Sequence, residues 1–283
     1  MTFDVTKKEI VNSLSTIYEK KEAINIADIV MEEVTKVSKI YRILNPNQQL
    51  TETETSILNS IMVRLLKNTP IQYITNKTWF GGLVLYVDES VLIPRPETDE
   101  LVEWIIGENN KTTNTLSVVD IGCGSGCIAL SIKNKLTHFN VTAIDVSEDA
   151  LEILKKNSND VGLNIEFKQI DFLDDTQWNC LNKFDIIVSN PPYIKLSESQ
   201  NMNNNVLQYE PKIALFVPDE DPLLFYDKIA LFAKNHLNEN GSIYVEINEK
   251  LGTETTDLFK QYQFETILKQ DLQGKNRFIK AYK

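Results

Sequence analysis

The chain has 283 residues, of which 42% are apolar and 24% are charged, so its composition is that of a globular protein with one or two domains. No apolar run approaches the roughly 18 residues that span a bilayer, and residues 1–7 hold no apolar stretch that could act as a secretory signal. Three cysteines, an odd number, do not form a disulfide framework. These features exclude a collagen-like, disordered or membrane-spanning chain, and we expect a cytoplasmic protein with no membrane partner.

Charge is distributed unevenly along the chain. The 29 basic and 40 acidic side chains give a net charge of −11. Residues 1–88 carry ten side chains of each sign, so the whole excess of acid lies in residues 89–283. Proteins that bind nucleic acids usually carry a basic surface for the phosphates. The charge therefore favours a protein, peptide or small-molecule partner, although solubility alone also accounts for an acidic surface.

Residues 1–68 are predicted to form a small helical bundle. Apolar side chains recur at three- and four-residue spacing in the stretches 11–18, 24–34 and 57–66. No glycine occurs before Gly81. The pattern is typical of amphipathic helices that pack against one another.

The remainder of the chain changes from helices to an alternation of strands and helices. Two short strands around a turn at Asp88-Glu89-Ser90 are predicted within residues 79–93. The alternation from residue 115 onward is typical of an α/β fold with a largely parallel sheet. Strands are expected at 116–121, 141–146, 165–170, 184–189 and 242–247, helices at 126–136, 148–158, 221–237 and 249–261, a final strand pair around 273–274, and a mobile loop at 197–207.

A cluster of glycines lies between a predicted strand and a predicted helix, at Gly122, Gly124 and Gly126. Glycines here let the backbone approach a ligand, because a Cβ atom would intrude, and the helix start offers free N–H groups. Asp145 ends the next strand, where a carboxylate can accept hydrogen bonds from both hydroxyls of a ribose. The pattern from Asp120 is D-x-G-x-G-x-G, whereas a dinucleotide fingerprint requires glycine at Cys127. A different nucleoside cofactor is favoured over a nicotinamide or flavin cofactor and over a ligand-free turn.

The strand that ends at Ser189 is followed by Asn190, Pro191, Pro192 and Tyr193. The two prolines fix φ and remove two backbone donors. The Asn190 amide oxygen and the Pro191 carbonyl can then accept both hydrogens of a planar –NH2 group, which leaves its nitrogen lone pair free to meet a methyl donor. Tyr193 offers an aromatic face for a flat group. The alternative is a turn that only ends the strand, but ligands of open α/β sheets bind at such strand ends.

These two motifs resemble those of Rossmann-like methyltransferases that use S-adenosylmethionine and act on planar nitrogens. The chain as a whole is similar to the release-factor glutamine methyltransferases. The matching segments are 70–73, 80–81, 91–98, 120–126, Asp145, 189–193, 210–211, 214–215, 245–247 and 271–274 with Arg277. The likeness is interrupted at 216–223, where the family usually has a glycine-containing stretch and this chain has no glycine.

The resemblance implies an α/β fold with three parts. These are an N-terminal helical substrate-recognition domain at 1–75, a β-hairpin linker at 76–96 and a Rossmann-like S-adenosylmethionine-dependent methyltransferase domain at 97–283. It also implies that the segment with Arg95 and Glu97 closes over the cofactor, with an ion pair that merely orders this segment as the alternative.

The resemblance further implies the residues of the site. Asp171 and Phe172 would flank the adenine, with core packing as the alternative for Phe172. The expected cofactor-binding residues are Asp120, Gly122, Cys123, Gly124, Ser125, Gly126, Asp145, Asp171, Phe172 and Asn190. The expected substrate-binding residues are Asn190, Pro191, Pro192 and Tyr193, of which Asn190 and Pro191 are expected to be catalytic.

The implied reaction transfers a methyl group from S-adenosylmethionine to the glutamine amide of the Gly-Gly-Gln motif in peptide chain release factors, leaving S-adenosylhomocysteine. We expect a monomer without a metal, since His138, His236 and the cysteines form no four-ligand zinc pattern. Catalysis would come from positioning and electrostatics, with no general base assigned. Adenine-specific DNA and ribosomal-RNA guanine methyltransferases are the alternatives, which the net charge of −11 disfavours. A non-enzymatic adaptor would be expected to lose one of the two motifs.

Overall fold

The computed structural model describes residues 1–200 and 202–283 in full, together with the backbone of Asn201. The chain divides into two units, one formed by Met1–Asn76 with Asn203–Tyr209 and the other by Lys77–Met202 with Glu210–Lys283. In the part of the chain described here, no helix combines the length and the apolar character needed to cross a membrane.

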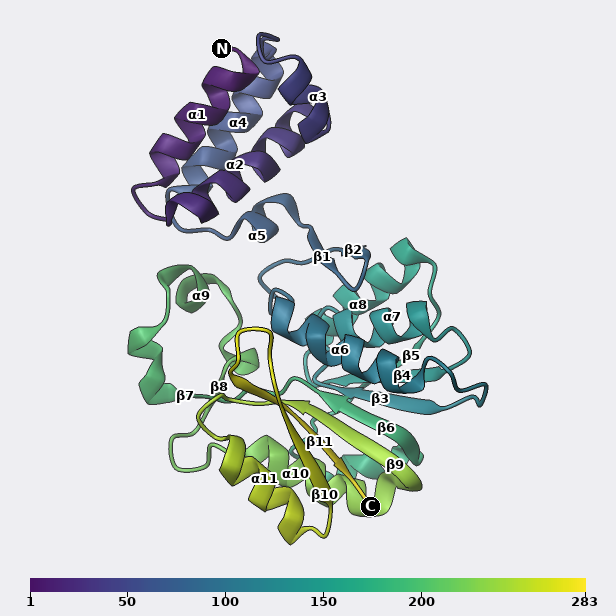
Figure 1. Cartoon of the computed structure of the whole chain (residues 1–283). Coiled ribbons are helices and arrows are strands. Elements are labelled where there is room, and N and C mark those ends of the chain that lie inside the picture. Colours follow the sequence, from purple (N-terminus) through teal and green to yellow (C-terminus); the bar gives the residue numbers. More distant parts are fainter. The chain divides into compact units, whose positions relative to one another are not determined.

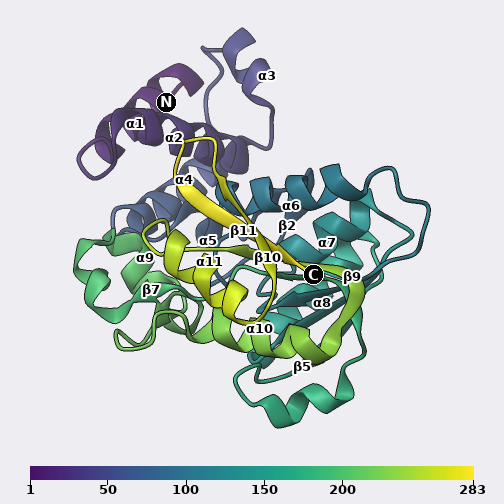
Figure 2. The same cartoon turned by 60° about the horizontal axis from the view of Figure 1, so that its bottom comes forward.

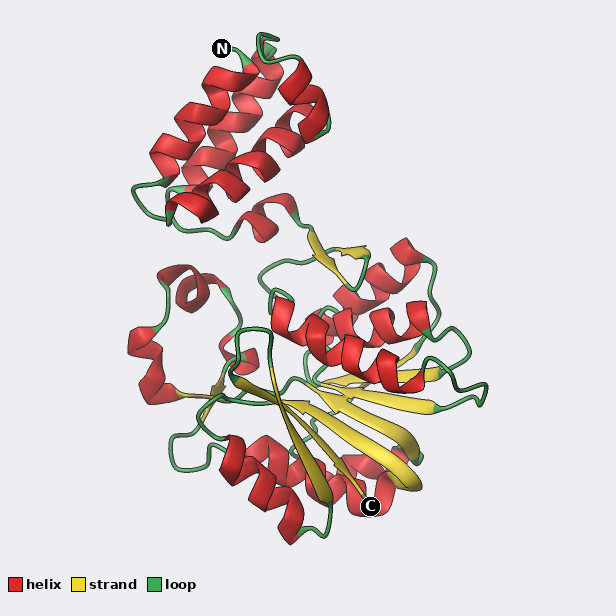
Figure 3. Cartoon of the chain, viewed as in Figure 1, coloured by secondary structure: helices red, strands yellow, loops and turns green.

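The first unit is helical, as the sequence pattern predicts (Figure 1; helices are red in Figure 3). Its N-terminal helices are α1 (Phe3–Leu14), α2 (Lys20–Thr35), α3 (Lys39–Leu44), α4 (Glu52–Leu65) and α5 (Ile71–Thr75). Leu14, Met31 and Leu65 are fully buried in one apolar core shared by α1, α2 and α4. The apolar faces of α1, α2 and α4 thus point into the interior of this unit, whereas α3 leaves its apolar side chains exposed.

Residues 203–209 fold with the helical unit although they follow the turn at 190–193, here called the acceptor turn, in the sequence. Helix α9 (Asn204–Tyr209) is short, and the Tyr209 hydroxyl donates a hydrogen bond of 3.0 Å to the Lys67 carbonyl. The segment Leu196–Asn201 forms a 3-10 helix. The loop predicted at 197–207 is therefore partly wrong, because local backbone bonds, such as that from Val206 N–H to the Asn203 carbonyl, close helical turns here.

The second unit is built on a seven-stranded sheet in the order β10-β11-β9-β6-β3-β4-β5. The strands are β3 (Ser117–Ile121), β4 (Asn140–Asp145), β5 (Glu166–Gln169), β6 (Phe184–Ser189), β9 (Leu237–Glu246), β10 (Glu265–Gln270) and β11 (Asn276–Tyr282). Strands β3 to β6 and β9 pair in parallel, whereas β11 is antiparallel to both of its neighbours. The predicted parallel strands and final strand pair are confirmed, with β9 beginning at Leu237 rather than at residue 242.

Helices cover both faces of this sheet (Figures 1 and 3). Helices on one face are α6 (Pro96–Asn109), α7 (Cys127–Lys135) and α8 (Glu148–Val161), and those on the other are α10 (Leu224–His236) and α11 (Gly252–Gln261), which Figure 2 brings forward. Two apolar cores lie between the sheet and these helices. Adjacent residues such as Val118 and Val119 are buried on opposite faces, which explains why the central strands read as continuous apolar runs.

The predicted hairpin exists, but its turn lies elsewhere. Strands β1 (Thr78–Phe80) and β2 (Leu83–Leu85) pair around Gly81 and Gly82 instead of around 88–90. These glycines have φ of 57° and 78°, the backbone that a tight hairpin turn demands and that other residues avoid. The turn predicted at 88–90 is therefore wrong, because the glycine pair supplies the positive φ at both positions of a two-residue hairpin loop.

The hairpin folds with the second unit, since the boundary lies between Asn76 and Lys77. Its side chains Phe80 and Leu85 belong to the core beneath α6, α7 and α8. The use of the helical unit in substrate recognition stays a prediction.

Candidate active site

A cavity of about 270 Å³ lies at the carboxyl ends of β3, β4 and β6. The strand order reverses at β3, and ligands of open α/β sheets bind at such a point. The cavity wall is formed by residues that follow or end four adjacent strands. These are Gly122 and Gly124 after β3, 145–147 at β4, 170–173 after β5 and 189–192 at β6. The glycine loop (residues 122–126) and the acceptor turn (residues 190–193) are far apart in the sequence but both contribute to the wall of the same cavity.

The glycine loop owes its shape to left-handed backbone. Gly122, Gly124 and Gly126 have φ of 71°, 52° and 79°, values that other residues rarely adopt. Gly122 N–H donates to the Ile144 carbonyl at 2.9 Å, which ties the loop to the end of β4. A Cβ atom on Gly126 would lie 2.9 Å from Leu154 Cδ1, so this glycine also permits α7 to pack closely on α8.

Asp145 holds the same loop with its side chain. Its Oδ2 accepts from Gly124 N–H at 2.8 Å, and its Oδ1 accepts from Ser147 N–H at 2.9 Å. Burial raises the pKa of Asp145, and these backbone hydrogen bonds oppose the rise. Each carboxylate oxygen has a second acceptor site, so Asp145 can still receive ribose hydroxyls. Its assignment to the ribose stays a prediction.

Asn157 is a support that sequence reasoning missed. This buried residue of α8 donates to the Ser125 carbonyl at 2.9 Å and to the Tyr86 carbonyl at 3.0 Å, and it accepts from Tyr86 N–H at 2.6 Å. It thereby ties the glycine loop to the segment after the hairpin. Nothing local distinguishes Asn157 among the polar residues of its helix, because its partners lie 32 and 71 positions away.

Four of the predicted cofactor-binding residues, Asp120, Cys123, Ser125 and Gly126, do not line the cavity wall. Asp120 is fully buried, and its Oδ2 accepts from Ala129 N–H at 3.1 Å, while Oδ1 has no hydrogen-bond partner among the described residues. Burial, together with the charge of Asp145, raises the pKa of Asp120 to about 7. The structure shows these residues shaping the loop, and their contact with a cofactor stays a prediction.

Asp171 and Phe172 both line the cavity, as predicted for the residues beside an adenine. Asp171 Oδ1 accepts from Leu173 N–H at 3.0 Å. The Phe172 ring lies 5.2 Å from the ring of Trp178 and 5.5 Å from that of Phe232, centre to centre. Phe172 thus belongs to the core and to the cavity wall at once, so both interpretations remain compatible with its position.

The acceptor turn is joined to two other elements by a chain of side-chain hydrogen bonds. Asn190 Nδ2 donates to Thr98 Oγ1 at 2.9 Å, and Thr98 Oγ1 donates to Glu246 Oε2 at 2.7 Å. The Tyr193 hydroxyl donates to Glu246 Oε1 at 2.9 Å. Asn190, Pro191 and Pro192 line the cavity, whereas Tyr193 does not, so an aromatic face offered to the substrate stays a prediction.

Glu246 is the buried centre of this network at the end of β9. Burial raises its pKa, and the bonds from Thr98 and Tyr193 and the charge of Arg277 counteract the rise. Burial and the nearby Glu246 raise the pKa of the Tyr193 hydroxyl, so this group remains a donor. Thr98 and Glu246 lie within segments that match the family, 91–98 and 245–247, but the sequence assigned neither of them to the site.

The segment before α6 contributes Ser90, Val91 and Leu92 to the cavity wall. Further along, Arg95 Nη2 lies 2.6 and 2.7 Å from the two carboxylate oxygens of the buried Glu210. Arg95 thus forms its ion pair with Glu210, a partner that the sequence did not indicate, whereas Glu97 accepts from Gln273 Nε2 at 3.4 Å. Closure of this segment over a cofactor stays a prediction.

The atypical stretch 216–223 begins with a short strand, β8 (Phe216–Val217), paired in parallel with β7 (Ile194–Lys195). Asp219 Oδ1 accepts from Ser197 N–H at 3.0 Å. These bonds connect the stretch to the backbone that follows the acceptor turn, so it is ordered here without a glycine.

The chemistry of the cavity wall fits S-adenosylmethionine. Asp145 and Asp171 are the only charged side chains in the wall as the structure describes it, and both are acidic. S-adenosylmethionine carries a sulfonium and an ammonium, which an acidic wall favours, whereas the pyrophosphate of a dinucleotide is repelled. Among the described residues, no group of three or more His, Cys, Asp or Glu is arranged to hold a metal ion.

Comparison with known protein families identifies the class. The family model of the methyltransferase small domain matches residues 103–210, and that of the PrmC N-terminal domain matches residues 8–75. With the sheet order and the cavity, these matches define an α/β methyltransferase that carries an N-terminal helical unit. The predicted fold class is confirmed.

Curated relatives identify the family within this class. A release factor glutamine methyltransferase from Flavobacterium psychrophilum is 43% identical over 278 residues, which cover 97% of each chain. One from Lactococcus lactis is 41% identical over 89% of this chain and 92% of its own. A solved release-factor-specific protein-(glutamine-N5) methyltransferase from Alicyclobacillus acidocaldarius is 27% identical over 67% of this chain and 93% of its own, with a TM-score of 0.42. The chain belongs to the release factor glutamine methyltransferase family.

Proposed function

We propose that this enzyme transfers a methyl group from S-adenosylmethionine to the side-chain amide nitrogen of the glutamine in the Gly-Gly-Gln motif of peptide chain release factors. The observation that carries the proposal is the position of Asn190, Pro191 and Pro192 on the same cavity as the glycine loop. Family membership supports the choice of substrate, because the two relatives above are named for release factor glutamine. The proposed setting is the cytoplasm, with a monomeric enzyme and no nucleic acid or membrane partner.

The residues of the acceptor turn account for the reaction by positioning. A glutamine amide nitrogen is a weak nucleophile, because its lone pair is delocalised into the carbonyl group. When bound, S-adenosylmethionine supplies a methyl group already activated on a positively charged sulfur. Asn190 Oδ1 and the Pro191 carbonyl hold the two amide hydrogens, orient the nitrogen and favour the positive charge that develops on it. The nitrogen gains the methyl group and releases one proton to solvent, so no metal or dedicated base is required.

The test compares labelled methyl transfer from S-adenosylmethionine to purified release factor, DNA and ribosomal RNA under identical conditions. We expect transfer to the release factor alone, at the glutamine identified by peptide mass spectrometry. A release factor whose Gly-Gly-Gln glutamine is replaced by alanine is the matched control. Transfer to a nucleic acid instead would contradict the proposal and favour one of the nucleic-acid methyltransferase alternatives.

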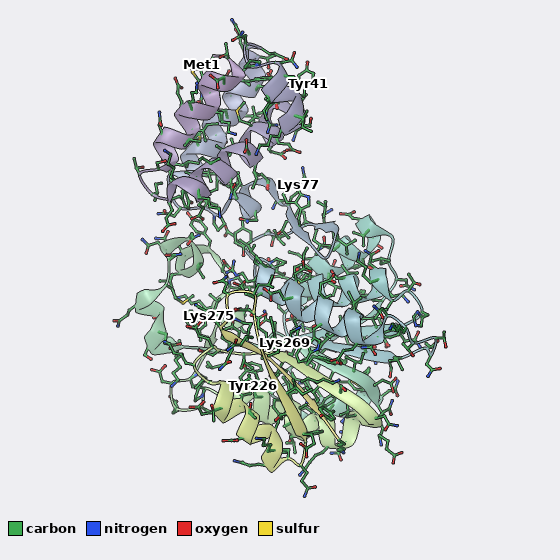
Figure 4. The ribbon with its side chains drawn as sticks, in the orientation of Figure 1. Met1, Tyr41, Lys77, Tyr226, Lys269 and Lys275 are labelled. Carbon is green, nitrogen blue, oxygen red and sulfur yellow. The ribbon has the colours of Figure 1, made fainter. Side chains whose placement is uncertain are left out.

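The helical unit is proposed to bind the release factor outside the Gly-Gly-Gln tripeptide. Helix α3 leaves Ile40, Tyr41, Ile43 and Leu44 exposed, with Leu44 at 74% (Tyr41 is labelled in Figure 4). Exposed apolar side chains gathered on one element indicate an interaction surface. Residues 1–88 also lack the acidic excess of residues 89–283, so the helical unit does not repel an acidic partner surface as the rest of the chain would.

The double substitution Ile43→Ser with Leu44→Ser tests this surface. We expect kcat/KM for the intact release factor to fall by roughly tenfold, as for loss of exposed anchors at an interface. Methylation of a short Gly-Gly-Gln peptide should be unchanged. Ile267→Ser on β10 exchanges an isoleucine that is 43% exposed in the second unit and serves as the control. Equal losses on factor and peptide would contradict the proposed role of α3.

A further inference from the structure

The hydrogen bonds around Asn190 fix the orientation of its side-chain amide as well as its position. Its side-chain partner Thr98 lies in the first turn of α6, and the partner of Thr98, Glu246, ends β9. These contacts span 92 and 148 positions of the sequence. One hydrogen-bond network therefore joins three separate elements of the second unit, and the Asn190 amide is its end at the cavity.

The donors and acceptors of this hydrogen-bond network determine which way the Asn190 amide points. Glu246 Oε2 accepts the hydrogen of the Thr98 hydroxyl at 2.7 Å. A hydroxyl has a single hydrogen to give, so Thr98 Oγ1 can only accept from Asn190. Asn190 therefore presents its NH2 group to Thr98 and keeps its oxygen for the cavity. An amide without such a partner has two nearly equivalent orientations, of which only one accepts from a substrate.

Glu246 accepts a hydrogen bond at each of its two carboxylate oxygens. Thr98 donates to Oε2 and Tyr193 donates to Oε1. Burial raises the pKa of Glu246, with a smaller contribution from the charge of Glu97, and the two hydrogen bonds and the charge of Arg277 oppose the rise. The Tyr226 hydroxyl donates to the Glu246 backbone carbonyl at 3.1 Å, which holds the end of the strand (Tyr226 is labelled in Figure 4). The network thus has a fixed acceptor at its buried end.

We infer that Thr98 and Glu246 are positioning residues, which orient the Asn190 amide so that its oxygen, and not its NH2 group, faces the substrate. The inference rests on the proposed function, because it assigns the purpose of this orientation to the –NH2 group of glutamine. With the opposite orientation, two NH2 groups would meet in the cavity and the substrate nitrogen would lose one of its two acceptors.

Thr98→Val tests the inference, because valine has the shape of threonine without its hydroxyl. We expect single-turnover methyl transfer to the release factor to slow by roughly 10-fold to 100-fold, since misplaced reacting groups lose rates of this order. The affinity for S-adenosylmethionine should change little. Thr98→Ser restores the hydroxyl and should recover most of the rate. Thr255→Val removes a buried threonine hydroxyl from α11, where it donates to the Leu251 carbonyl, and should leave the rate unchanged.

A double mutant separates positioning from a structural role. If Thr98 acts through Asn190, adding Thr98→Val to Asn190→Ala should cause no further loss of rate. If Thr98 only stabilises the packing of α6, the two losses should multiply instead, and this result would overturn the inference.

A measurement without any variant of Thr98 follows the orientation itself. In the nuclear magnetic resonance spectrum of the wild-type protein, the Asn190 NH2 protons should show contacts to the Thr98 side-chain protons and slow exchange with solvent. Absence of these contacts would overturn the inference even where Thr98→Val fails to fold. If the wild type does not methylate release factor, the proposed function fails, whereas the spectrum still reports whether Thr98 orients the amide.

Discussion

The glycine loop and the acceptor turn lie at neighbouring strand ends, yet they are shaped in different ways. In the glycine loop, left-handed Gly122 and Gly124 form the surface, and their N–H groups donate to the Ile144 carbonyl and to the Asp145 side chain on the next strand. In the acceptor turn, the side-chain amide of Asn190 forms the surface. Its orientation depends on Thr98, which lies 92 positions away in the sequence, and through Thr98 on Glu246, which lies a further 148 positions away. A backbone surface suits a cofactor that must be bound firmly, whereas an oriented amide suits a group that must be aligned for reaction.

The comparison predicts that substitutions in the two regions affect different measured quantities. The turn should govern the rate of methyl transfer, and the loop should govern cofactor affinity. A substitution that changes the rate of methyl transfer and the cofactor affinity by the same factor would contradict this division.

The largest effect is expected from Asn190→Ala. It removes the acceptor for one substrate hydrogen, so single-turnover transfer to the release factor should fall on the order of 100-fold or more. Cofactor affinity, measured by calorimetry on the same protein, should change much less. Near-wild-type turnover by a folded variant would return the Asn-Pro-Pro-Tyr segment to a merely structural turn.

Asp145→Ala should produce the converse result. A hydrogen bond to a charged group contributes about 1.5–3 kcal/mol, so affinity for S-adenosylmethionine should fall by roughly 10-fold to 100-fold. Turnover at saturating cofactor should change far less. Asp145→Asn, which keeps an acceptor oxygen, is the graded control and should lie between the wild type and Asp145→Ala. Unchanged calorimetric affinity in Asp145→Ala would rule out the ribose assignment.

Two glycines of the loop should differ in how much stability they lose. Gly124→Ala should cost about 1 kcal/mol of unfolding free energy from left-handed strain alone, because no atom lies within 4 Å of the new Cβ. Gly126→Ala should lose roughly a further 1 kcal/mol, because its Cβ would lie 2.9 Å from Leu154 Cδ1. Urea denaturation measures both. Equal losses would show that the packing of α7 on α8 tolerates the added atom.

The smallest effect is expected from thiol alkylation. Burial raises the pKa of the Cys123 thiol and raises that of Cys127 to about 12, so neither forms the reactive thiolate at neutral pH. The exposed Cys180 should be the residue that iodoacetamide modifies at pH 7.5, and its alkylation should leave rate and affinity within about twofold. Mass spectrometry of the treated enzyme identifies the site. Rapid modification of Cys123 would indicate that the glycine loop opens in solution.

The helices and the sheet were largely predictable because their signals are local. Apolar periodicity located α2 and α4, and apolar runs located the parallel strands. The stretch predicted at 11–18 runs past the end of α1 at Leu14, and α3, whose apolar side chains are exposed, was not predicted. The hairpin turn was misplaced, although Gly81 and Gly82 marked it. The return of residues 203–209 to the helical unit had no local signal, because its contacts, such as that between Tyr209 and Lys67, join distant positions.

The candidate site divides along the same line. By itself, the sequence determined the glycine loop, Asp145 and the Asn-Pro-Pro-Tyr turn, because each is a short pattern whose chemistry follows from neighbouring residue types. Only the tertiary structure decided that the two motifs line one cavity, that Asn157 supports the loop, and that Thr98 and Glu246 orient Asn190. The physical reason is that a hydrogen bond has a direction and a length of about 3 Å, and only the folded chain brings its donors and acceptors into that geometry.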